Sequence, residues 1–113
     1  MRQVRRHPDF EADYVAQLAW LVSQGASTRI VQLTDGLHEV VRMLSAFPVA
    51  GPKVAESGSV LLRKLIFPKG PFVAWYLYDA AEPDGELWLV RLFHARQKRS
   101  NPAQTIRRAR RAL

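Results

Sequence analysis

Apolar residues in the first half of the chain recur at spacings of three and four positions, which is typical of amphipathic helices. The first such stretch follows Pro8 and ends near Ser23, and Asp9 is the residue that we predict as its N-cap. A short strand over residues 3–7 is expected before this helix. The apolar stripe of the helix consists of Phe10, Tyr14, Leu18 and Leu21.

A second stretch with the same spacing begins at Ser27 or Thr28, either of which is a suitable N-cap, and it runs to about Phe47. Gly25 ends the first helix, so only a few residues connect the two. Helices joined by so short a link pack side by side in opposite directions. We therefore predict an antiparallel helical hairpin.

The period of the apolar residues changes to two in the second half of the chain, as expected for strands. The segment 48–58 contains two prolines and two glycines and is predicted to be a polar loop. Tight connections at 68–71 and 83–85 separate the strands that follow, so these strands should pair as an antiparallel meander. The predicted strands are 59–67, 72–78 and 86–95.

Near the C-terminus, Asn101 followed by Pro102 resembles an N-cap with proline at the first helical position, and a short basic helix over 103–113 should follow. The predicted fold class is therefore α+β. It combines an N-terminal strand, the helical hairpin packed on a twisted antiparallel sheet, and the basic C-terminal helix. We assign residues 1–100 to one domain and residues 101–113 to a helix or tail attached to it.

Charge is distributed unevenly along the 113 residues, although the formal net charge is only +7. The last acidic residue is Glu86, and eight of the 17 Lys and Arg residues follow it. The nine cations before that point face all ten acidic residues, a balance of −1. This asymmetry indicates a polyanionic partner, such as a nucleic acid, an acidic protein segment or a membrane surface. A solvated basic tail is the alternative interpretation.

Other features of the composition narrow the class of protein. There is no cysteine, which excludes disulfides and thiolate metal sites, and the three histidines lack the spacing of metal ligands. We predict no metal and no cofactor. No apolar run approaches the roughly 20 residues of a membrane span, and the basic N-terminus lacks the apolar segment of a signal peptide. These features predict a cytoplasmic protein that does not insert into membranes.

Two arginines, Arg63 and Arg91, interrupt strands that are otherwise apolar. Their strands flank the same central strand, so the two side chains form a cationic patch if they share a face. Guanidinium groups can hold a phosphate or carboxylate through two hydrogen bonds each. Alternatively, each arginine lies along the sheet and pairs with a local acid. The residues predicted to bind a polyanion are Arg63, Arg91, Arg96, Lys98 and Arg99, with His94 beside them.

The order of these elements, together with several motifs, resembles the RelE/ParE superfamily of bacterial type II toxins. The match covers about residues 4–99, and its motifs lie at 46–51, 62–65, 72–76 and 89–96. These read AFPVAG, LRKL, FVAWY and LVRLFHAR. The segment 98–102, together with Ile106 and Ala109, is also similar to the end of phage-derived HigB-like toxins.

The resemblance implies a small α+β toxin that is held inactive by an antitoxin encoded nearby, often through an acidic or amphipathic antitoxin segment. ParE-like members inhibit DNA gyrase, whereas RelE-like members cleave mRNA on the ribosome. The length and the Phe-Pro…Gly pattern favour ParE-like action, with RelE- or HigB-like cleavage as the alternative. A nucleic-acid-binding module without toxicity is a third possibility. Whether the chain is an enzyme depends on which of these targets it has.

If the chain is a nuclease, the resemblance implies a metal-independent endoribonuclease with His94 as general acid or base. Histidine suits this role because its charge changes near neutral pH. Arg63 and Arg91 would then hold the phosphate, since such cleavage needs cations for the charge of the transition state. No carboxylate lies near His94 in the sequence, and Glu56 is the acid that the fold could bring to it.

Overall fold

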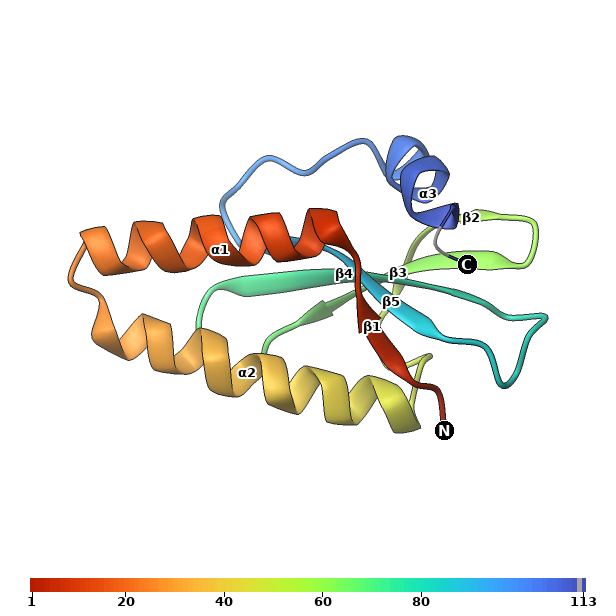
Figure 1. Ribbon diagram of the computed structural model, residues 1–113, viewed down its shortest axis with the longest axis horizontal. Coiled ribbons are helices and arrows are strands. Elements are labelled where there is room, and N and C mark those ends of the chain that lie inside the picture. The colour runs from red at the N-terminus through yellow and green to blue at the C-terminus, as the bar shows by residue number, and fades with distance from the viewer. Residues whose placement is uncertain (112) are drawn as a thin grey trace.

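The structure of the protein is a computed structural model that describes residues 1–111 and 113 (Figure 1). It has the predicted α+β fold, in which two long antiparallel helices joined by a short turn pack on a twisted sheet. A third helix follows the last strand. The elements are β1 (Val4–Arg6), α1 (Pro8–Ser23), α2 (Ser27–Ala46), β2 (Lys53–Ser57), β3 (Val60–Ile66), β4 (Phe72–Asp79), β5 (Leu87–His94) and α3 (Pro102–Arg110).

The starts of the two long helices differ in detail from the sequence prediction. His7, not Asp9, is the N-cap of α1, because the backbone N–H of Asp9 donates to Nδ1 of His7 at 3.0 Å. Asp9 instead lies in the first turn, where the helix dipole favours a carboxylate. The residue before α2 is Ala26, which makes no side-chain capping bond, so the prediction of Ser27 or Thr28 as cap is also wrong.

The five strands form one sheet in the order β1-β5-β4-β3-β2. The predicted antiparallel meander is present as β3, β4 and β5, but β1 pairs with β5 in parallel, so the complete sheet is mixed. The strand β2 lies where a loop was predicted. It joins β3 through a two-residue turn, in which Gly58 takes a φ of +59° that suits glycine.

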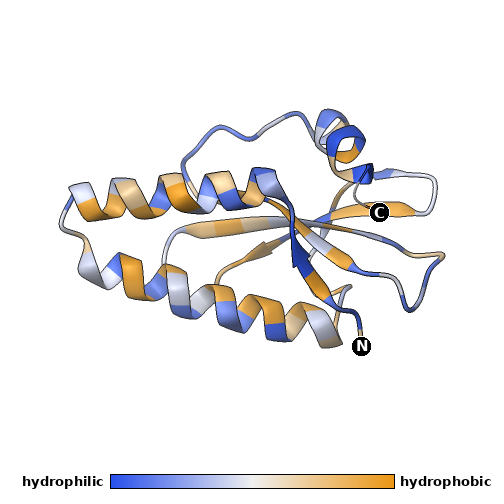
Figure 2. Cartoon of the chain, in the orientation of Figure 1, coloured by the Kyte–Doolittle hydropathy of each residue, from blue (hydrophilic) through white to orange (hydrophobic). Residues whose placement is uncertain are grey.

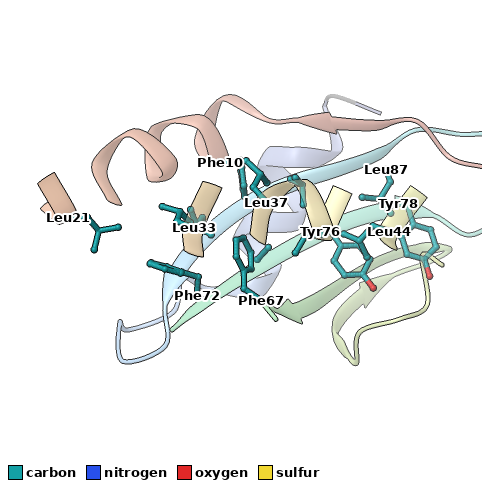
Figure 3. Packing of buried hydrophobic residues seen from close by; sticks show 14 residues of the cluster. Phe10, Leu21, Leu33, Leu37, Leu44, Phe67, Phe72, Tyr76, Tyr78 and Leu87 are labelled. Carbon is teal, nitrogen blue, oxygen red and sulfur yellow. The ribbon is translucent and has the colours of Figure 1, made fainter. Parts of the chain in front are cut away.

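One face of the sheet, here called the hairpin face, is covered by α1 and α2. Figure 3 shows side chains from both helices meeting those of the sheet. A fully buried leucine or phenylalanine stabilises a fold by roughly 2 kcal/mol, so this cluster makes a large contribution to stability. Its largest fully buried members are Phe10, Leu21, Leu33, Leu44, Phe72, Tyr76, Leu87, Leu89 and Leu92.

The opposite face of the sheet, here called the α3 face, is covered in part by α3. Ile106 and Ala109 are only 4% and 1% exposed and pack against apolar side chains of β3, β4 and β5. The helix begins as predicted, with Asn101 as N-cap and Pro102 as first residue, and Figure 2 shows it as mainly hydrophilic with apolar residues interspersed. It ends at Arg110 rather than at 113, and Ala112 lies outside the described residues.

Because both faces are covered, all seven residues from Phe72 to Tyr78 of the central strand β4 are buried. This explains why β4 is apolar at nearly every position instead of alternating with polar residues. In the part of the chain that the structure describes, no helix combines the length and the apolar character needed to cross a bilayer.

Candidate functional site

The predicted site is centred on the end of β5, and a β-bulge decides where its side chains point. Tyr76 of β4 pairs with Leu89, whereas the adjacent Trp75 pairs with Arg91. Val90 is therefore an extra residue in β5, and it shifts the alternation of the side chains by one position. As a result, Arg91 shares the α3 face with Trp75.

The second arginine of the predicted patch points to the other side of the sheet. Arg63 pairs with Tyr76, whose side chain belongs to the hairpin-face cluster. Arg63 and Arg91 therefore lie on opposite faces, and the hypothesis that they form one cationic patch is wrong. Strict alternation from Leu89 would have placed Arg91 on the hairpin face as well, so the bulge is the physical reason for the difference.

Arg63 holds the connection between α2 and β2. Its Nη1 donates to the carbonyl oxygen of Gly51 at 2.8 Å, and its Nε donates to the hydroxyl of Tyr78 at 3.1 Å. The same connection is fixed by Tyr76, whose hydroxyl accepts from the Gly51 N–H at 3.1 Å and donates to the Pro48 carbonyl at 2.7 Å. Burial raises the pKa of Tyr76, so the hydroxyl stays protonated and can keep donating.

Arg91 is neutralised by Asp13 of α1. The guanidinium donates to both carboxylate oxygens, from Nε at 2.7 Å and from Nη2 at 3.1 Å, and it also donates to Ser100. Asp13 accepts a third bond from the backbone N–H of Leu92 at 2.9 Å. The Arg91 and Asp13 side chains are 25% and 18% exposed. The alternative interpretation, an arginine paired with a local acid, is therefore the one that the geometry supports for Arg91.

His94, in contrast, opens onto a pocket of about 580 Å³ between α1 and the end of β5. Its ring lies 6.4 Å from the ring of Trp20, an α1 residue that is 53% exposed, and 6.1 Å from that of Phe72. Its Nδ1 accepts from the backbone N–H of Arg96 at 3.3 Å. The neutral ring therefore carries its proton on Nε2, which is the nitrogen left to donate to a ligand.

The sequence interpretation missed both α1 residues that matter here. Asp13 was hidden because acidic residues are common near any helix start. Trp20 carried a usable signal, since it lies off the apolar stripe of its helix and a large aromatic residue there is unusual. Glu56 does not approach His94. It lies on β2, which is separated from β5 by the two strands β4 and β3, and its Oε1 accepts from Lys53 Nζ at 2.7 Å.

The three remaining predicted binding residues lie in the segment that follows β5. Arg96 and Lys98 are exposed, and neither forms a salt bridge within residues 1–111 and 113. Arg99 is partly used to hold the segment, because its Nη1 donates to the carbonyls of His94 at 3.1 Å and Gln97 at 2.5 Å. Of the predicted residues, His94 and Arg96 therefore line one pocket. The Arg99 guanidinium lies 5.0 Å from the ring of Phe93, the same ring that the Arg91 guanidinium approaches at 5.2 Å, and Arg63 is on the hairpin face.

This arrangement can bind an anion beside an exposed ring, but it does not assemble the predicted nuclease set. Metal-free RNA cleavage needs an acid, a base and cations around one phosphate. Arg63 and His94 pair with Tyr76 and Phe72, four residues apart along β4, which corresponds to roughly 14 Å. Arg91 is on the opposite face.

No protein-family model matches the chain, and no curated protein matches its sequence. The membership of the RelE/ParE superfamily therefore stays a prediction that rests on the ordered motifs. Any function assigned to the chain has to be supported by its fold and by the geometry of its site.

Proposed function

We propose that the chain is the toxin of a bacterial type II toxin–antitoxin pair and inhibits growth when free of its antitoxin. The order of β1, the helical hairpin and the antiparallel strands agrees with the fold that the RelE/ParE resemblance implies, and this agreement supports the proposal. The proposed site of action is the cytoplasm. The proposed partner is an antitoxin encoded nearby, with an acidic or amphipathic segment that complements the basic last quarter of the chain.

Inhibition of DNA gyrase in the manner of ParE is the activity that we favour. The observation that carries this choice is the separation of Arg63, Arg91 and His94, because a nuclease would need them around one phosphate. An inhibitor that acts by binding needs only an exposed surface. Arg96 and Lys98 supply charge on such a surface.

Ribosome-dependent mRNA cleavage is the second candidate, and the His94 pocket is the observation that favours it. The pocket presents an imidazole, the half-exposed ring of Trp20 and the chain around Arg96. Such a group of residues can stack a base and contact a phosphate or a leaving oxygen. Binding to the ribosome would then have to bring a further cation or acid to the site.

The two candidates make opposite predictions for His94→Ala. The chain should be expressed inducibly in bacteria with and without the neighbouring gene, and the purified protein assayed for gyrase supercoiling and for translation-coupled mRNA cleavage. We expect growth arrest, rescue by the neighbouring gene product, and inhibition of supercoiling that survives His94→Ala but weakens in Arg96→Ala/Lys98→Ala. Arg29→Ala/Arg42→Ala removes the same charge from α2 and is the matched control.

Three outcomes would change the conclusion. Folded protein that causes no growth arrest would reject the toxin proposal. Strand cleavage of mRNA that His94→Ala abolishes, with supercoiling unaffected, would replace gyrase with the ribosome as the target. Binding to any nucleic acid without growth arrest would point to a non-toxic nucleic-acid-binding module.

A further inference from the structure

We infer that the outer side of α3 binds the phosphate backbone of B-form duplex DNA without reading its sequence. The helix and its C-cap place four arginines within five positions, at 107, 108, 110 and 111. This surface is separate from the His94 pocket, so the inference goes beyond the proposed function and does not depend on it. The inference rests on three observations: the contacts that anchor α3, the unpaired cations on its outer side, and the absence of aromatic and large apolar side chains there.

The first observation is that α3 is held on the body of the protein and is not a loose basic tail. Ile106 and Ala109 are buried on the α3 face. The Arg108 guanidinium donates to both carboxylate oxygens of Asp9 at 2.9 Å, and Arg110 donates to Ser57 Oγ at 3.0 Å. Contacts to α1 on one side and to β2 on the other fix the rotation of the helix.

The second observation is that this rotation presents two unpaired cations to solvent. Arg107 and Arg111 are four positions apart, so they lie on the same side of the helix, away from Ile106 and Ala109. Both are exposed, and neither forms a salt bridge in the described part of the chain, 1–111 and 113. No acidic residue follows Glu86, so nothing on the helix itself offsets their charge.

The third observation concerns which partner such a surface fits. Between Pro102 and Arg110 the exposed residues are alanine, glutamine and arginine, with no aromatic or large apolar side chain. A protein interface needs apolar or aromatic anchors in its centre, single-stranded nucleic acid needs aromatic rings on which its bases stack, and a membrane-bound helix needs an apolar face. Duplex phosphates need only cations.

The form of the duplex follows from the shape of the surface. A helix that stands out from a sheet is a convex ridge about 10 Å wide. The major groove of B-form DNA, roughly 12 Å wide, admits such a helix between its two phosphate rows. The major groove of A-form RNA is deep and narrow and excludes it. We therefore commit to duplex DNA as the partner, contacted through its phosphates.

The test measures the salt dependence of binding to a fluorescent DNA duplex of about 20 base pairs. Each phosphate contact contributes about 0.9 to the slope of log affinity against log salt. Arg107→Gln/Arg111→Gln should therefore lower the slope by about 1.8. When NaCl is raised fourfold, the affinity of the unmodified chain should then fall by a factor about 12 times larger than the factor by which the affinity of the variant falls. Arg29→Gln/Arg42→Gln makes the same change of charge on α2, on the other side of the sheet, and should leave the slope unchanged.

Further arms of the experiment distinguish the alternatives. A duplex of scrambled sequence should bind equally well, whereas duplex RNA, single-stranded DNA and poly-glutamate should bind more weakly at equal charge. An unchanged slope in Arg107→Gln/Arg111→Gln, with its thermal unfolding unaltered, would overturn the inference, and so would poly-glutamate or duplex RNA binding as tightly as DNA. Growth arrest without DNA binding would overturn this inference alone, and DNA binding without growth arrest would overturn only the proposed toxin function.

Discussion

Replacing Asp13 by asparagine should destabilise the protein, because Arg91 would keep its charge and lose its counterion. Asp13 accepts three hydrogen bonds, two from Arg91 and one from the Leu92 N–H, and its side chain is 18% exposed. Removing one partner of a fully buried ion pair costs about 3–5 kcal/mol, whereas exposed pairs are worth less than about 1 kcal/mol. Asparagine can still accept a bond, so we expect a loss of about 2 kcal/mol.

Urea denaturation measures this loss as a change in the free energy of unfolding. A decrease of about 2 kcal/mol corresponds to a melting temperature about 8 °C lower, given an unfolding entropy near 2.1 cal/mol/K for each of the 113 residues. Glu39→Gln is the matched control, because it breaks a pair whose Arg42 and Glu39 side chains are 75% and 52% exposed. It should change the stability by less than about 0.5 kcal/mol.

A second variant separates the contribution of the Asp13–Arg91 charges to stability from the contribution of side-chain packing at the same positions. Asp13→Leu/Arg91→Met replaces the pair by apolar side chains and should recover part of the loss, since a well-packed apolar pair often matches a buried ion pair in stability. If the Asp13→Asn variant is as stable as the Glu39→Gln variant, the claim that the Asp13–Arg91 pair stabilises the protein is refuted. In that case Asp13 does not hold Arg91, and Arg91 would again be available to a polyanion.

Three other changes test the connections around the sheet. Gly51→Ala should cost about 3 kcal/mol or more by thermal denaturation, because its Cβ would lie 1.7 Å from the Lys64 carbonyl oxygen. Tyr76→Phe leaves the Gly51 N–H without its partner and should cost about 1–3 kcal/mol in urea; equal stability would count against that bond. The Arg108 hydrogen bond holds the pKa of Asp9 below its usual 3.8. The pair therefore contributes its full stability at pH values above the unfolded-state pKa, and this contribution is lost as the pH falls through the lower, folded-state pKa. The difference in unfolding free energy between the unmodified chain and Asp9→Asn should therefore shrink on acidification, and a constant difference would contradict this.

The helices and the meander were predictable because each repeats a strong apolar period over many residues. The strand β2 was not, since its sequence, Lys53–Ser57, is short and partly polar and lies at the edge of the sheet. An edge strand has one strand neighbour, so it needs fewer apolar residues to hold it. The turn glycine, Gly58, was visible in the sequence, but only the pairing of its flanking residues identifies the hairpin.

The candidate site was predicted in part, and the reason is the bulge at Val90. The segment Leu89–Leu92 contains neither the glycine nor the proline that often marks a bulge, so strict alternation was the natural assumption. One extra residue reverses the face of every later side chain in the strand. His94 and Arg96 line one pocket because they are close in sequence, whereas the meeting of Arg63 and Arg91 depended on the register of the strands.

The uneven charge of the sequence has a structural explanation in these contacts. Acidic residues on the first turns of α1 pair with cations of the last quarter, Asp9 with Arg108 and Asp13 with Arg91. The Asp9–Arg108 pair fixes α3 on the body, and Arg91 of the other pair also donates to Ser100 in the segment before α3. The remaining cations of that quarter are thereby held in place without being neutralised, which a flexible basic tail would not achieve. A fixed arrangement of charge binds a rigid polyanion at a smaller cost in conformational entropy than a disordered one, so holding the unpaired cations in place favours polyanion binding even though neither acid touches the partner.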